Sequence, residues 1–222
     1  MNDNIFANNT QETISEKYVS LTEIMGYPTK MLDSEKFSEL DEKLKEKIYW
    51  ALNKPEEIIK KNGTTMKQQK EEKKDREKKW GNNMIGQINN GQWTTILGER
   101  LVFDILKILG QNPRKVVKKE GFEPDWETDE YMYEVKTSNW WVDGTAGEKV
   151  YGTFIKYQKV PELYGKPLRI VCLANQENEL EFGKTKYFGE EVTEKTKKIL
   201  ELAKTWDIEY IRFRDLVNPI IQ

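Results

Sequence analysis

The spacing of apolar positions divides the chain into two parts near residue 93. In the first part the apolar residues follow helical spacing. Thr13 and Glu16 are placed as a capping box ahead of a periodic run that ends near Gly26. A second helix is predicted from Ser34 to about Leu52. The N-terminal part is therefore expected to be helical.

From Trp93 onward, helical and strand-like segments alternate. The stretch Thr94 to Leu109 has helical spacing and Gly110 after it, Tyr131 to Thr137 alternates with period two, and Leu168 to Ala174 is almost entirely apolar. Weaker patterns predict short strands at 115–117 and around Pro124, a helix at 193–206 and a strand at 208–213. We expect an α/β fold, with a mixed central sheet flanked by helices and an N-terminal helical extension.

The composition supports one large domain or a domain that carries an extension, because the chain has 222 residues. Only 37% of them are hydrophobic, but 7 Trp, 10 Tyr and 8 Phe supply enough aromatic surface for a core. The first ten residues lack the basic start of a signal peptide, and no apolar stretch reaches the ~18 residues of a membrane helix. An intracellular, cytoplasmic protein that does not contact a membrane is therefore expected.

The absence of histidine limits the chemistry most strongly. With no histidine and one cysteine, Cys172, the chain has no disulfide framework, no Cys/His zinc site and no Ser-His-Asp triad. Catalysis would have to use carboxylates, lysine, tyrosine or serine, or a hard cation bound to oxygen.

Basic residues are concentrated in one segment. The formal net charge of the chain is -2, yet residues 60–80 hold nine basic and four acidic side chains, a local charge of +5. Such a segment is either a solvated helix with i,i+4 ion pairs or an arm that neutralises DNA phosphates. The candidate phosphate contacts are Lys70, Lys73, Lys74 and Lys78.

An amide-rich segment follows the basic one. Residues 82–92 contain six Asn and Gln residues and two glycines, which predicts a loop. Asn and Gln can pair with adenine N6 and N7 in the major groove, although a biased codon composition enriches asparagine equally well. The candidate base-reading residues are Asn82, Asn83, Asn89 and Asn90.

The strongest candidate chemistry lies in the strand YMYEVKT. Period-two alternation places Glu134 and Lys136 on one face, and Asp125 stands nine residues before Glu134 in a turn-rich stretch that can connect two antiparallel strands. Two carboxylates and a lysine can hold Mg²⁺ and act on a phosphate. The alternatives are an exposed salt bridge between Glu134 and Lys136, and a turn role for Asp125.

Pro124-Asp125 followed by Glu134-Val135-Lys136 resembles the PD-(D/E)XK motif, and the order of helices and strands over roughly 93–177 is similar to the core of that nuclease superfamily. The resemblance implies that 93–222 form a catalytic core with Asp125, Glu134 and Lys136 in the site. It also implies a role for a glutamate from the preceding helix. Glu99 is bracketed by apolar residues and is that candidate, as catalytic residue or metal ligand; the alternative is a buried pair with Lys136 or Arg169.

The resemblance is greatest to type II restriction enzymes, which implies Mg²⁺-dependent, site-specific cleavage of double-stranded DNA by a homodimer. The chain has no nucleotide-binding motif, which agrees with that class. Residues 1–92 would serve for DNA grip or dimerisation. Asn139, Trp140 and Trp141 follow the strand and are candidates for DNA contacts, with packing against the N-terminal extension as the alternative. A repair or junction-resolving nuclease and a non-catalytic DNA-binding protein are the other functions that these features fit.

Overall fold

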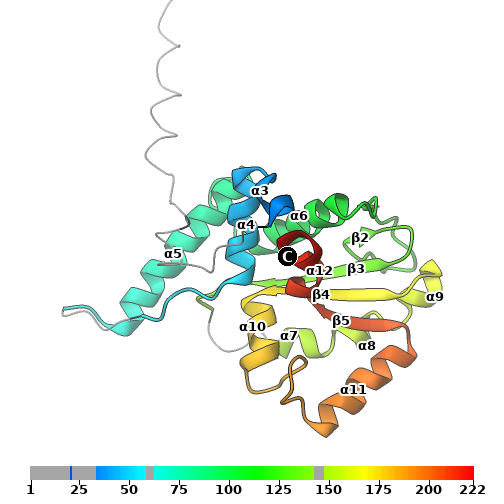
Figure 1. Cartoon of the computed structure of the whole chain (residues 1–222). Coiled ribbons are helices and arrows are strands. Elements are labelled where there is room, and N and C mark those ends of the chain that lie inside the picture. Colours follow the sequence, from blue (N-terminus) through cyan, green and yellow to red (C-terminus); the bar gives the residue numbers. More distant parts are fainter. Residues whose placement is uncertain (1–20, 22–33, 59–62, 143–147) are drawn as a thin grey trace, which may run out of the picture.

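A computed structural model describes residues 21, 34–58, 63–142 and 148–222 (Figure 1). Within these residues five strands form one open sheet in the order β1-β2-β3-β4-β5. The strands β1 (Arg114–Lys115), β2 (Trp126–Glu127) and β3 (Met132–Ser138) are antiparallel. The strands β3, β4 (Leu168–Ala174) and β5 (Ile208–Arg212) are parallel. The prediction of an α/β fold with a mixed sheet is confirmed.

Helices cover both faces of the sheet (Figure 1). On the upper side in the figure, α4 (Glu42–Leu52), α6 (Trp93–Ile108) and α12 (Phe213–Ile221) contact the sheet, and α3 (Glu35–Ser38) and α5 (Met66–Met84) pack against these helices. On the lower side lie α7 (Glu148–Tyr151), α8 (Thr153–Lys156), α10 (Asn175–Phe182) and α11 (Glu194–Thr205), and α9 (Val160–Tyr164) lies at the end of the sheet beside β4. None of the helices in the described residues is long and apolar enough to cross a membrane.

The alternation of β3 separates two hydrophobic cores. Tyr133 and Val135 lie in the core that contains the buried residues of α4, α5, α6 and α12. Met132 lies in the other core, with Tyr157 and residues of α7 to α11. The predicted two faces of this strand are thus confirmed. The buried β4 contributes to both cores, as its apolar sequence predicts.

Several predicted boundaries are wrong. The strand expected around Pro124 begins only after Asp125, at Trp126, and the strand expected at 115–117 is β1 at 114–115. The helix expected from Ser34 is divided into α3 and α4, because Asp41 is extended and its side chain accepts the Leu44 N–H at 3.0 Å as an N-cap. The helix expected between Thr13 and Gly26 lies outside the described residues, apart from Leu21.

The basic segment is helical for most of its length. Helix α5 begins at a capping box of Thr65 and Gln68 and continues to Met84, so the predicted loop starts three residues later than expected. The helix continues because tertiary packing holds its end: a Cβ on Gly81 would lie 2.0 Å from the Trp93 ring, and Trp80 is fully buried. The helix therefore belongs to the same core as the sheet.

Helix α6 approaches β3 closely at Gly98. A Cβ at this position would lie 1.8 Å from Thr137 Oγ1 and 2.9 Å from Thr137 Cβ. Glycine is thus required where the helix that carries Glu99 crosses the strand that carries Glu134.

We predict that Gly98→Ala destabilises the protein by about 1–3 kcal/mol, because the added methyl group must displace either the helix or Thr137. Unfolding in urea measures this change. Gly91→Ala is the matched control, since a Cβ there meets no atom within 4 Å. The explanation fails if both variants unfold at the same urea concentration as the parent.

Candidate active site

The candidate site lies where β3 loses its neighbour on one edge. Strand β2 pairs with β3 only at Met132 and Tyr133. Beyond Tyr133, no strand in the described residues pairs with this edge. The Val135 N–H instead donates to Asp125 Oδ2 at 2.7 Å. A backbone hydrogen bond therefore holds the Asp125 carboxylate beside the residue that separates Glu134 from Lys136.

Glu134 and Lys136 project from β3 toward the lower helices. Glu134 is 4% exposed, and its Oε1 accepts hydrogen bonds from Lys136 Nζ and, at 2.9 Å, from the Tyr157 hydroxyl. The other oxygen, Oε2, is buried and has no hydrogen-bond partner among the described residues. The expected shared face of Glu134 and Lys136 is present. An exposed salt bridge is not, since Glu134 is buried.

Tyr157 was not predicted from the sequence as part of the site. Phe154, Tyr157 and Val160 recur every three residues, and all three are buried against the sheet. That periodicity was the available signal, because a buried tyrosine hydroxyl requires a polar partner. Its partner is the carboxylate that the motif singles out.

Burial and mutual repulsion disfavour the ionised forms of Asp125 and Glu134. Burial raises the pKa of Asp125 to about 6; the nearby charge of Glu99 raises it as well, while the Val135 N–H and Lys136 oppose the shift. Burial and then the charge of Asp125 raise the pKa of Glu134 above its usual range, against the influence of Lys136 and Tyr157. A cation placed between these carboxylates would offset their burial and mutual repulsion.

Glu99 lies on α6, on the other face of the sheet, and its charge acts on Asp125. Its backbone oxygen accepts a hydrogen bond from Trp126 Nε1 at 2.9 Å, which fastens α6 beside Asp125, and its side chain is only partly buried. Neither alternative pair, with Lys136 or with Arg169, occurs among the described residues. Arg169 stacks on Tyr131 instead, with 3.5 Å between its guanidinium carbon and the ring centroid.

The described residues fit a two-carboxylate metal site. They contain no group of three or more Asp, Glu or Cys side chains that could hold a metal ion, so the predicted set of Asp125, Glu134 and Glu99 does not converge in this structure. Mg²⁺ commonly uses one or two carboxylates and completes its shell with water and substrate phosphate. Asp125 and Glu134 meet that requirement, and the unpartnered Glu134 Oε2 is an oxygen suited to a cation.

The candidate lysines of α5 are all partly buried and lie on one stripe of the helix. Lys73 Nζ lies 4.7 Å from the centre of the Trp141 ring and donates to the Glu56 carbonyl at 3.2 Å. Lys74 pairs with Glu71 at 3.7 Å. The stripe formed by Lys70, Lys73, Lys74 and Lys78 is called the lysine stripe below.

The four candidate asparagines are not equivalent. Asn82 is buried, and its amide group bonds to the Lys78 carbonyl and to the backbone N–H and carbonyl of Asn90. Asn90 also accepts the Gln92 N–H at 2.7 Å. Asn83 and Asn89 are exposed, and Asn89 has a positive φ of 55°. The Asn82 side chain is therefore engaged in hydrogen bonds within the protein, whereas Asn83 and Asn89 are exposed to solvent.

The segment after β3 packs against the N-terminal helices. Trp140 Nε1 donates to the Trp50 carbonyl at 3.0 Å, Trp141 is 9% exposed, and the side-chain oxygen of Asn139 is buried without a hydrogen-bond partner in the described part of the chain. The alternative of packing against the extension is thus confirmed for both tryptophans.

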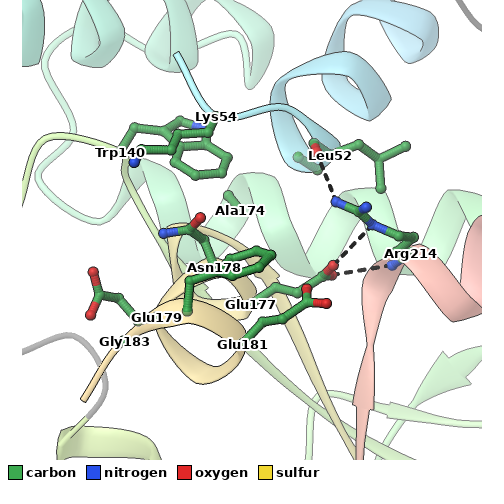
Figure 2. Close-up of a pocket in the computed structure, with 12 residues that line it drawn as sticks. Leu52, Lys54, Trp140, Ala174, Glu177, Asn178, Glu179, Glu181, Gly183 and Arg214 are labelled. Atoms are coloured by element: carbon green, nitrogen blue, oxygen red, sulfur yellow. Dashed lines mark hydrogen bonds and ion pairs between the residues drawn. The ribbon is translucent and has the colours of Figure 1, made fainter. Parts of the chain in front are cut away.

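A separate cavity of about 430 Å³ lies at the carboxyl ends of β3 and β4. Figure 2 shows Arg214 at one side of it: its Nε lies 3.4 Å from Glu177 Oε1, and a terminal nitrogen donates to the Leu52 carbonyl at 3.3 Å. Burial raises the pKa of Glu177 to about 7. The Arg214 guanidinium connects α4 to α10 through these contacts, so this cavity is explained by helix packing. The edge of β3 is therefore the candidate site.

Comparison of the chain with protein-family models, with curated proteins and with solved structures finds no match. The case for function therefore depends on the motif and on the geometry around β3.

We predict that Glu99→Gln lowers the pKa of Asp125 from about 6, because a negative charge that disfavours ionisation is removed. Carboxyl NMR titration of the metal-free protein measures it. Asp104→Asn, on the same helix but paired with Lys47, is the control and should leave Asp125 unchanged. An unchanged Asp125 pKa in Glu99→Gln would separate Glu99 from the site.

Proposed function

We propose that the protein is a Mg²⁺-dependent endonuclease that hydrolyses phosphodiester bonds of double-stranded DNA at a specific short sequence, as type II restriction enzymes do. The observation that carries the proposal is the meeting of Asp125, Glu134 and Lys136 at the open edge of β3, with a buried carboxylate oxygen that lacks a partner among the described residues. Motif and geometry support the same chemistry independently.

Each residue has a distinct role in this proposal. Asp125 and Glu134 would hold Mg²⁺, which supplies positive charge to the phosphate and lowers the pKa of a bound water. The Val135 N–H and the Tyr157 hydroxyl keep the two carboxylates oriented. Lys136 orients or deprotonates the attacking water, or neutralises the charge that develops on phosphorus.

The N-terminal helices would provide the grip on DNA. The net charge of -2 gives the whole molecule no attraction to DNA, so the lysine stripe of α5 must supply the local positive charge. A palindromic recognition sequence would be matched by a homodimer, because a two-fold axis in the DNA requires one in the protein.

A plasmid digest with Mg²⁺ tests the activity. We expect the parent to give defined fragments whose ends share one sequence. Asp125→Asn should abolish cleavage but retain DNA binding, since it removes a negative charge near the phosphate. Lys136→Ala should slow cleavage by at least ~10²-fold.

The matched control is Asp129→Asn, because Asp129 is exposed, pairs with Arg114 and lies outside the site. Cleavage by Asp125→Asn at the parental rate would refute the site. Equal cleavage of unrelated sequences would indicate a structure-specific repair or junction-resolving nuclease. Intact plasmid with bound parent protein would indicate a DNA-binding protein without catalysis.

The lysine stripe makes a separate prediction about affinity. Replacing Lys70, Lys73, Lys74 and Lys78 together with glutamine should weaken binding to all duplexes and flatten its salt dependence, by about 0.9 log units per log unit of salt for each phosphate that is no longer neutralised. Fluorescence anisotropy at several salt concentrations measures both. The control replaces four lysines of α11, on the lower face: Lys195, Lys197, Lys198 and Lys204. Equal slopes in both variants would leave α5 as a solvated helix.

A further inference from the structure

A carboxylate is buried in the middle of the basic helix α5. Glu77 has no exposed surface, and its Oε1 accepts hydrogen bonds from Trp50 Nε1 at 2.8 Å and from the Trp140 N–H at 3.0 Å. The Trp140 N–H also lies 3.2 Å from Oε2. Trp140 Nε1 also donates to the Trp50 carbonyl, so that α4, α5 and the segment after β3 are joined by a closed set of hydrogen bonds around one carboxylate.

The hydrogen bonds around Glu77 involve Trp140, which lies close to the candidate site in the sequence. It stands four residues after Lys136, on the segment that leaves β3. Beyond Tyr133 the outer edge of β3 has no strand beside it in the described residues, and there Asp125 accepts the N–H of Val135. Glu77 accepts the N–H of Trp140 in the turn that directly follows β3. Carboxylates thus hold the backbone both at the free edge of β3 and at its exit.

The other end of the connection is the lysine stripe. Glu77 lies one helical turn after Lys73, whose ammonium sits over the Trp141 ring at 4.7 Å. Helix α5 therefore holds the exit of β3 at two successive residues, through Glu77 and through Lys73. The contact with Trp140 is a backbone hydrogen bond to a buried carboxyl group, both oxygens of which lie within reach of the Trp140 N–H.

Burying a carboxylate is costly, and burial raises the pKa of Glu77 to about 7, although the N–H groups of Trp140, Trp50 and Trp141 lower it. An apolar residue would fill this position in a helix whose only task is to pack. What glutamate adds is an acceptor for donors on two other segments.

We infer that Glu77 is a positioning residue that ties the DNA-gripping helix α5 to the strand carrying Glu134 and Lys136, so that grip and chemistry are held in one register. This inference rests on the proposed function. It predicts that loss of the Glu77 carboxylate impairs cleavage more than binding.

Glu46 provides a matched control. Its Oε2 accepts Trp80 Nε1 at 3.2 Å, so it joins α4 to α5 through the same type of bond, a tryptophan ring N–H to a carboxylate. This bond connects two N-terminal helices to each other, whereas the bond from Trp140 connects α5 to the exit of β3. Glu46→Ala is therefore a test of general loosening of the helices.

The experiment compares Glu77→Ala, Glu77→Gln and Glu46→Ala with the parent, using the full chain. The hydrogen-exchange rate of the Trp140 backbone amide measures its hydrogen bond to Glu77 directly and does not depend on catalytic activity. We expect exchange in Glu77→Ala to be faster by about tenfold or more, because the buried acceptor of the Trp140 N–H is removed. DNA affinity in Ca²⁺ should stay within about twofold, because the lysine stripe is intact.

Cleavage at saturating DNA should fall in Glu77→Ala by roughly 10- to 100-fold, with the KM little changed, since small displacements of reacting groups have large effects on rate. Glu77→Gln keeps an acceptor oxygen and should recover most of the rate and of the Trp140 protection. Glu46→Ala should leave both close to parental.

Parental protection of Trp140 in Glu77→Ala would overturn the inference. So would equal losses of cleavage in Glu77→Ala and Glu46→Ala, which would show general destabilisation, or a failure of Glu77→Gln to restore protection. If the parent itself leaves DNA uncut, the proposed function fails while the exchange data still decide whether Glu77 fixes the exit of β3.

Discussion

The hydrogen bond from the Val135 N–H to Asp125 holds a carboxylate at the free edge of β3, next to the residues that carry the proposed function. Strand β2 is only two residues long, so the edge of β3 is free where Glu134 and Lys136 lie. Asp125 occupies that free edge by accepting the N–H of Val135, which lies between Glu134 and Lys136. Its position is thus set by the strand itself, and its negative charge is brought close to Glu134 at an energetic cost that a bound cation would offset.

The N-terminal helices are part of this arrangement. The ring of Trp50 in α4 packs against two others: its centroid lies 5.6 Å from that of Trp80 in α5 and 5.8 Å from that of Trp93 in α6. All three rings lie in the core that also contains Val135. The described part of the extension therefore shares a core with the sheet. Packing in this core and the hydrogen bond from Trp140 to Glu77 connect α5 to the exit of β3. Under the proposed function, this connection would hold a DNA-binding helix and a reaction site in a fixed arrangement.

The sequence predicts what local periodicity controls. The two faces of β3, the buried β4 and the long α6 follow from periods of two and 3.6 and from apolar runs, and the same alternation brings Glu134 and Lys136 together. It does not predict a two-residue strand, which is too short to have a period, so the start of β2 at Trp126 was missed. The continuation of α5 through Asn82 and the burial of Glu77 result from tertiary contacts with Trp93, Trp50 and Trp140. Trp80 was the one local signal, since Glu77 lies three residues before it on the same helical face.

The central claim is that Asp125 and Glu134 form a divalent-cation site at the open edge of β3. Crystals soaked in Mn²⁺, measured by anomalous diffraction, test it most directly. The account predicts a peak within bonding distance of both carboxylates, with Glu134 Oε2 as a ligand. A difference map with no peak there, at a Mn²⁺ concentration that supports cleavage of DNA, would contradict it.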